Sequence, residues 1–198
     1  MATQFNKIDR ETWLTEAAQF ILSDILAPLA ELPTRPFRIS IGFPSGKVSK
    51  VVAQCWSSNA SSDGTNEIFV TPIIDDSIEI LAALTHELIH YLDDLESGHR
   101  KFFAEAAREA GLEGKLTATV AGEALTEQLK GYTDILGDIP HAKIDPAQSG
   151  KKKQKTRMLK VQCNACAFNF RATQSNIDAM VFNNCLSCEN GALHTENN

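Results

Sequence analysis

The stretch Thr85-His86-Glu87-Leu88-Ile89-His90 carries the most specific chemical pattern in this 198-residue chain. Apolar residues recur around it at helical spacing, which predicts one long and largely buried helix over residues 78–95. Histidines four positions apart lie on one helical face, so both imidazoles can reach a single ion. The alternative is a chance pattern, but two unpaired histidines in a buried helix would be costly. The H-E-x-x-H pattern therefore favours zinc ligation by His86 and His90.

Glu87 gives this site its predicted chemistry. It lies about 100° around the helix from His86, too far to be a ligand but close enough to contact a zinc-bound water. Zinc lowers the pKa of such a water towards roughly 7, and a neighbouring carboxylate can take its proton as it attacks a carbonyl. Glu87 is therefore the predicted general base of a hydrolase.

A catalytic zinc needs a third protein ligand and one open position. His99 is the first candidate, because Gly98 breaks the helix and allows the chain to turn back over the metal. The carboxylates just after His90 are alternatives, and the two remaining histidines rank lower because they lie in or beyond a less ordered part of the chain. These further candidates are Asp93, Asp94, Glu96, His141 and His194.

The sequence around the motif predicts a small sheet and several helices. Alternating apolar residues predict strands, and apolar residues at helical spacing predict helices closed by glycine or proline. The fold class is therefore α+β, with the sheet packed on the motif helix. The predicted strands cover residues 37–43, 51–56 and 67–71, and the other helices cover residues 9–32, 101–110 and 122–136.

Four of the five cysteines form two pairs, Cys163-x-x-Cys166 and Cys185-x-x-Cys188, separated by eighteen residues. This spacing is typical of a zinc ribbon. Four thiolates fill a tetrahedral shell, so this second zinc is predicted to be structural. The alternatives, a redox pair or disulfides, are disfavoured in a reducing compartment. Cys55 is predicted to be a buried core thiol.

The motif helix, together with Gly98-His99-Arg100-Lys101-Phe102, resembles the metallopeptidase core of SprT-like proteins, a family that includes the Spartan DNA–protein crosslink proteases. The likeness is greatest to the short SprT-like proteins of bacteria, phages and mobile elements, and it covers nearly the whole chain. It implies a zincin-like core followed by a zinc ribbon. It also implies His86, His90 and His99 as zinc ligands and Glu87 as catalytic base.

Two departures from the family pattern concern the third ligand. Family members often have Gly-His-Gly-x-x-Phe, whereas Arg100 replaces the second glycine here. The interval between His90 and His99 is also shorter than in the Spartan branch. Both departures weaken the transfer of the Spartan substrate to this chain.

The charge of the chain is unevenly distributed. The formal net charge is -6, yet the segment from Pro146 onward holds seven Lys/Arg against three Asp/Glu, which leaves residues 1–145 at -10. The predicted domains are a metallopeptidase core (1–145), a basic flexible linker (146–157) and the zinc ribbon (158–198).

Basic residues near Phe168 and Phe170 predict contact with DNA through phosphates and stacking, with a merely solvated linker as the alternative. These basic residues are Lys151, Lys152, Lys153, Lys155, Arg157 and Lys160.

Composition and the N-terminus bear on the compartment. Hydrophobic residues make up 43% and charged residues 22%, which is typical of a soluble globular protein. The first residues lack a basic start followed by an apolar run, and no segment reaches the roughly 18 apolar residues of a membrane span. A cytoplasmic protein with no membrane partner is expected.

Two functions of different classes fit these observations. The first is a zinc metallopeptidase that acts on a protein substrate. The basic residues of the C-terminal part extend this hypothesis to DNA-associated proteins as substrates. The alternative is a non-catalytic zinc-ribbon adaptor for nucleic acid or protein, with a structural or idle H-E-x-x-H site. A structural zinc has no use for a carboxylate beside its first histidine, so Glu87 favours the enzyme.

Overall fold

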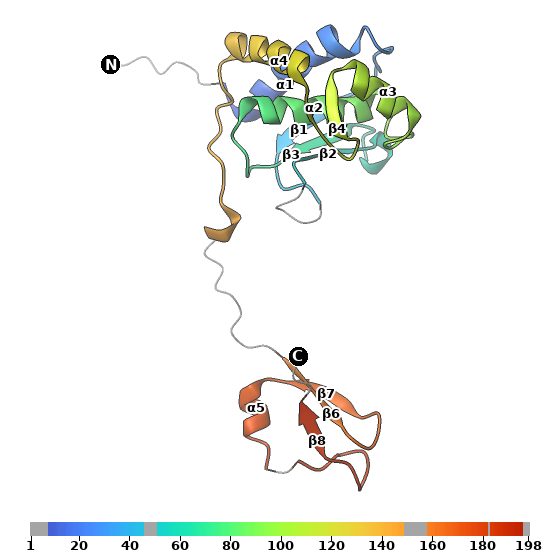
Figure 1. Ribbon diagram of the computed structural model, residues 1–198, viewed down its shortest axis with the longest axis vertical. Helices are drawn as coiled ribbons and strands as arrows, with labels where there is room; N and C mark the ends of the chain where they lie inside the picture. Colours follow the sequence, from blue (N-terminus) through green and yellow to red (C-terminus); the bar gives the residue numbers. More distant parts are fainter. Residues whose placement is uncertain (1–7, 46–50, 149–157, 182, 196–198) are drawn as a thin grey trace, which may run out of the picture. The chain divides into compact units, whose positions relative to one another are not determined.

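The computed structural model describes residues 8–45, 51–148, 158–181 and 183–195 (Figure 1). Within it the chain divides into Met1–Ala147, here called the core unit, and Gln148–Asn198, the C-terminal unit. The division falls inside the range predicted as a linker. A short 3-10 helix, Pro146–Gln148, occupies the start of that range, and residues 149–157 lie outside the described residues.

The core unit contains a three-stranded sheet with the order β1-β3-β2. β1 is parallel to β3 and β2 is antiparallel to it, so β2 lies at one edge. Side chains alternate along these strands, and Ile39, Ile68 and Val70 are buried against the helices. The strands are β1 (Phe37–Ile41), β2 (Ala53–Trp56) and β3 (Asn66–Val70), with a 3-10 helix at Ser58–Ala60 between β2 and β3.

The first helix, α1 (Arg10–Phe20), begins at a side-chain cap, because Asp9 Oδ1 accepts a hydrogen bond from Thr12 N at 2.7 Å. It continues as a π-helix over Ile21–Leu26. The predicted helix over residues 9–32 was therefore too long at its C-terminal end. Pro28 has no N–H to donate, and beyond it only turn hydrogen bonds follow, from Leu29 N and Ala30 N to Leu26 O.

The motif helix, α2 (Ser77–Leu92), is capped by Asp76, which accepts from Glu79 N at 2.8 Å. It contacts β2 and β3 on one side and α4 on the other, and Figure 1 shows it between the sheet and α4. Twelve of its sixteen residues are buried, which confirms that the motif lies on a buried helix. The helix ends three residues before its predicted end.

Two further helices and a hairpin complete the core unit. The predicted helices are present, whereas no pattern in the sequence predicted the hairpin. Glycines with positive φ stand before β4 (Gly111, φ 81°) and within it (Gly114, φ 91°). The elements are α3 (Lys101–Glu109), β4 (Leu112–Lys115), β5 (Ala118–Ala121) and α4 (Glu123–Leu136).

The C-terminal unit is an antiparallel three-stranded sheet with the order β7-β6-β8 and one short helix. Apart from cysteines, its buried apolar residues among those described are Val161 and Ala172. Its elements are β6 (Leu159–Cys163), β7 (Asn169–Ala172), α5 (Gln174–Asp178) and β8 (Leu193–Thr195).

The described chain is thus a mixed α+β protein with small sheets, as predicted at this coarse level. A search of the described helices found none with the length and apolar character needed to cross a bilayer.

Candidate functional site

Three histidines of the core unit converge on one point. The Nε2 atom of His99 lies 3.3 Å from Nε2 of His86 and 3.3 Å from Nε2 of His90. One nitrogen from each of the three rings lies within 4.8 Å of the other two. Three imidazole nitrogens at this spacing match the donor set of a zinc site with one open position.

A left-handed turn after α2 brings His99 to the other two histidines. Asp94 (φ 54°), Leu95 (φ 65°) and Gly98 (φ 52°) all have positive φ. Such conformations cost energy for residues other than glycine, so the surroundings must hold the turn in place. The side chain of Asp94 stabilises the turn, because its carboxylate accepts hydrogen bonds from Ser58 N (2.7 Å), Ser58 Oγ (2.6 Å) and Asn66 Nδ2 (2.7 Å).

Phe103 lies against all three histidine rings. Its ring centroid is 4.7 Å from that of His86, 4.4 Å from that of His90 and 4.9 Å from that of His99, and its side chain is fully buried. A rigid aromatic floor of this kind restricts the rotamers of the three rings. The signal for it in the sequence is the Gly-His-Gly-x-x-Phe pattern of the SprT-like proteins, which, counted from Gly98, has its Phe at position 103.

The hairpin supplies a hydrogen-bond partner for His86. His86 Nδ1 lies 2.8 Å from Thr119 Oγ1 on β5. The tautomer with its proton on Nδ1 donates to this hydroxyl and leaves the Nε2 lone pair directed at the other histidines. His90 Nδ1 is buried and has no hydrogen-bond partner among the described residues. Thr119 was missed by sequence reasoning because nothing in the sequence indicated the hairpin.

The histidines are held in the neutral form that binds metal ions. Burial, followed by the proximity of the other histidines, lowers the pKa of His86 to about 3. Burial lowers the pKa of His90 to about 4 and also lowers the pKa of His99. At neutral pH the three lone pairs are therefore available to a cation.

Glu87 lies on α2 between His86 and His90, and its side chain is buried, with 7% of the residue exposed. Burial raises the pKa of its carboxyl group to about 7, although the hydrogen bond from Cys55 N lowers it. That bond, 2.7 Å long, joins the backbone of β2 to Oε2 of Glu87 and orients the carboxylate. Cys55 itself is buried in the core, as predicted for its thiol, and burial raises the pKa of that thiol.

The cluster includes His99 and none of the alternative third ligands. Asp94 is engaged with Ser58 and Asn66, as described above. Asp93 Oδ2 accepts from Ser97 N at 3.0 Å. His141 lies between Arg10 and the Pro72 carbonyl, and His194 belongs to the C-terminal unit, near Gln162.

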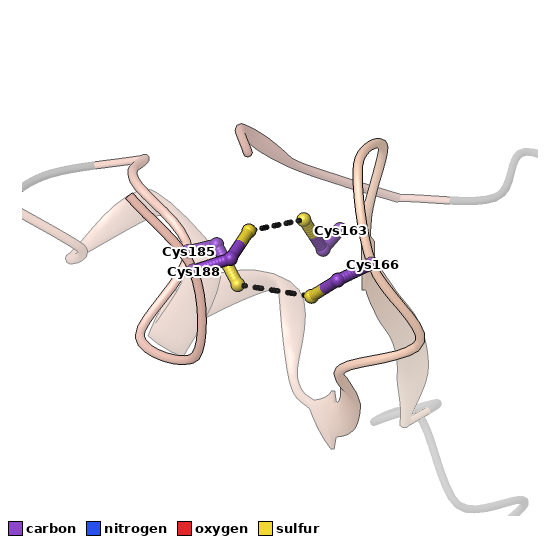
Figure 2. Close-up of side chains that lie close together, drawn as sticks. All are labelled: Cys163, Cys166, Cys185 and Cys188. Atoms are coloured by element: carbon purple, nitrogen blue, oxygen red, sulfur yellow. Dashed lines mark hydrogen bonds between the residues drawn. The ribbon is translucent and has the colours of Figure 1, made fainter. Parts of the chain in front are cut away.

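The four paired cysteines of the C-terminal unit face one another (Figure 2). Sγ of Cys163 lies 3.7 Å from Sγ of Cys188, and Sγ of Cys166 lies 3.7 Å from Sγ of Cys185. These distances are far longer than a disulfide bond, and all four thiols are free.

Backbone donors face the sulfurs of this cysteine cluster. The hydrogen bond from Ala165 N lowers the pKa of Cys163 to about 7, which favours its thiolate, whereas the hydrogen bond with Cys166 raises the pKa of Cys188 to about 12. Ser187 N lies 3.3 Å from Cys185 Sγ in the second knuckle. The cluster is a second candidate metal site, and its donors are compatible with zinc.

The structure describes only a small part of the predicted nucleic-acid surface. Lys151, Lys152, Lys153, Lys155 and Arg157 lie outside the described residues. Lys160 lies on β6, where it pairs with Arg171 of β7 in the strand register. The rings of Phe168 and Phe170 are half-buried, with centroids 6.0 Å apart.

Comparisons with known proteins gave no match for this chain among protein-family models, curated proteins or solved structures.

Proposed function

We propose that this chain is a zinc-dependent metallopeptidase of the SprT-like type, with a zincin-like core. His86, His90 and His99 would hold the ion, and Glu87 would act as general base. The observation that carries the proposal is the convergence of three imidazoles, two of them on α2, beside the buried carboxyl group of Glu87 on that helix. A metal site that served only to hold the fold together would not need that carboxylate.

When bound, zinc supplies Lewis acidity and activates a water for attack on a carbonyl group. The residues of the chain supply the proton transfer. Glu87 is suited to it because burial has raised the pKa of its carboxyl group to about 7, near neutral pH. Cys55 N holds Oε2 of the carboxylate, so the second oxygen is left for the proton.

The open edge of β2 beside Glu87 supports the proposal that the substrate is a polypeptide. β2 is the edge strand of its sheet, and Cys55 N donates to Glu87 instead of to β3. Hydrogen-bonding groups alternate in direction along a strand, so those of Ala53 point to the same open side as Cys55 N. An extended peptide can pair with such an edge. The basic residues from Lys151 to Lys160 extend the proposal to DNA-associated proteins as substrates.

The test combines metal content with proteolysis of an unfolded protein such as casein. Wild type should hold two zinc ions per chain, and His86→Ala should hold one. Glu87→Gln should keep both ions and lose activity by roughly 10²- to 10⁴-fold, the usual contribution of a general base. Glu109→Gln, at an exposed position on α3, is the matched control and should cleave like wild type.

Two results would contradict the proposal. Full activity in Glu87→Gln would remove the general base. One zinc per chain in both wild type and His86→Ala would leave only the cysteine site, and the adaptor function would then be preferred.

A further inference from the structure

A cavity of about 570 Å³ opens beside His86 and Glu87, and the proposed chemistry does not use it. Four segments line it: one face of α2, the strand β5 with the residue before it, the residues that lead into β2, and Thr126 of α4. Apolar side chains from these segments form most of its wall, namely Ile78, Ala82, Ala83, Val52, Val120 and Ala121. Its volume is within the usual range for ligand pockets.

The helical repeat explains why the cavity adjoins the reacting groups. Ala82, Ala83, His86 and Glu87 lie three, four, seven and eight residues after Glu79, so all five share one face of α2. Ala83 is one helical turn, about 5.4 Å, before Glu87. A group that fills the cavity therefore lies next to the bond on which Glu87 would act.

The composition of the wall determines which group fits. Alanines on the helix face leave a hollow where larger side chains would have filled it, and burying an apolar group there is favourable. The charged or ionisable groups that line the cavity are Glu79, Glu87 and His86, and none of the described lining residues is a lysine or arginine. An acidic side chain would lose its hydration against the apolar wall and lie near the carboxyl groups of Glu79 and Glu87.

We propose that this cavity is a specificity pocket for a bulky aliphatic or aromatic side chain next to the cleaved peptide bond. The inference rests on the proposed peptidase function and adds the class of sequence that is cut. An extended peptide on the edge of β2 directs alternate side chains to one face, so one of them can enter the pocket.

The first measurement uses the zinc-loaded full chain. Cleavage sites in casein are mapped by mass spectrometry, and peptides that differ only at the preferred position (Phe, Leu, Ala or Asp) are then compared. The Phe and Leu peptides should exceed the Ala peptide in kcat/KM on the order of tenfold or more, and the Asp peptide should be the poorest.

Substitutions that fill the cavity test whether its lining residues cause the preference for a bulky side chain. Ala83→Leu should reduce the Phe-to-Ala ratio of kcat/KM at least several-fold, and Val120→Phe should do so from the opposite wall. Val120 is 60% exposed, so the second variant keeps the test valid if the first does not fold. Ala124→Leu, at an exposed position of α4 outside the pocket lining, is the matched control and should keep the wild-type ratio.

A binding measurement separates the two proposals. The Phe and Ala peptides are titrated into Glu87→Gln and followed by NMR, with and without Ala83→Leu. Selective binding of the Phe peptide that Ala83→Leu removes, without cleavage by wild type, would support the pocket and overturn the peptidase. Cleavage with no preference, or a ratio unchanged in both filled variants, would overturn the pocket and leave the peptidase standing.

Discussion

The two candidate metal sites differ in what holds their ligands in place. The histidines lie on or beside α2, inside a continuous apolar core to which α1, α2, α4 and the sheet all contribute. The cysteines lie in a unit where Val161 and Ala172 are the buried apolar residues apart from cysteines, among those described. Such a small unit cannot fold on apolar burial alone. A metal would thus hold the C-terminal unit together, whereas the core unit would be folded before any metal arrives.

The largest expected effect concerns the cysteine site. A Cβ at Gly191 would overlap Cys163 Sγ and lie 2.9 Å from Cys188 Sγ, so Gly191→Ala should prevent tetrahedral ligation. Because structural zinc contributes about 10–16 kcal/mol in small zinc domains, the C-terminal unit should then unfold. Metal content should fall to one ion, with loss of dispersed NMR signals from residues 158–195.

The matched control for this change is Gly131→Ala in α4, where an added Cβ meets nothing within 4 Å. It should leave both ions in place. If Gly191→Ala also kept two ions and its NMR dispersion, the dependence of the C-terminal unit on metal would be disproved.

The next prediction tests whether apolar packing, without metal, stabilises the core unit. Leu14 is fully buried in α1, and Leu14→Ala should lower the free energy of unfolding by about 2–5 kcal/mol. Both tryptophans belong to the core unit, and Trp13 is fully buried. Guanidinium unfolding followed by tryptophan fluorescence therefore reports on this unit.

Two comparisons accompany the Leu14 measurement. Leu186→Ala, at a side chain that is 70% exposed in the C-terminal unit, should leave the transition unchanged. A chelator should shift the transition less than Leu14→Ala does. A larger effect of the chelator would mean that metal also stabilises the core unit, and the contrast between the two sites would disappear.

A smaller effect is expected at the hydrogen bond between His86 and Thr119. Thr119→Val removes the acceptor for His86 Nδ1 and should weaken zinc binding at the histidine site by about 10- to 100-fold. Competition with a chelator measures this, and the cysteine site serves as an internal reference. Thr119→Ser should restore the affinity, because it returns the hydroxyl. Equal affinities in the valine and serine variants would show that the hydroxyl plays no part.

The smallest effect concerns DNA. Deleting residues 146–198 should leave the zinc at the histidine site in place while lowering DNA affinity and flattening its dependence on salt, since the basic residues are removed. Fluorescence anisotropy of a labelled oligonucleotide at several salt concentrations measures both. Unchanged affinity and salt slope in the truncated chain would rule out the tail as the DNA contact.

The parts of the site that were predictable depend on short-range regularities. His86, Glu87 and His90 follow from the helical period, and the cysteine cluster follows from the spacing of its two pairs. His99 was a candidate because Gly98 precedes it, but Asp93, Asp94 and Glu96 lie nearer to His90 in the sequence. The contacts that hold Asp94 come from Ser58 and Asn66, which no local pattern connects to it.

The hairpin was missed for a local reason. β4 has the sequence Leu-Glu-Gly-Lys, and only Leu112 in it is buried. Without alternating apolar residues, a strand of this kind gives no pattern to detect. Thr119 and one wall of the cavity were consequently missed as well.

By itself, the sequence determined which residues can ligate metal, the buried helix that carries two of them and the cysteine pairs, because each depends on periodicity or spacing within a few residues. Only the tertiary structure decided that His99 completes the histidine cluster, that Phe103 and Thr119 support it, and that Cys55 N orients Glu87. These contacts join segments up to 33 residues apart. They arise because apolar burial packs β2, α3 and β5 around α2, and no interaction between sequence neighbours encodes that packing.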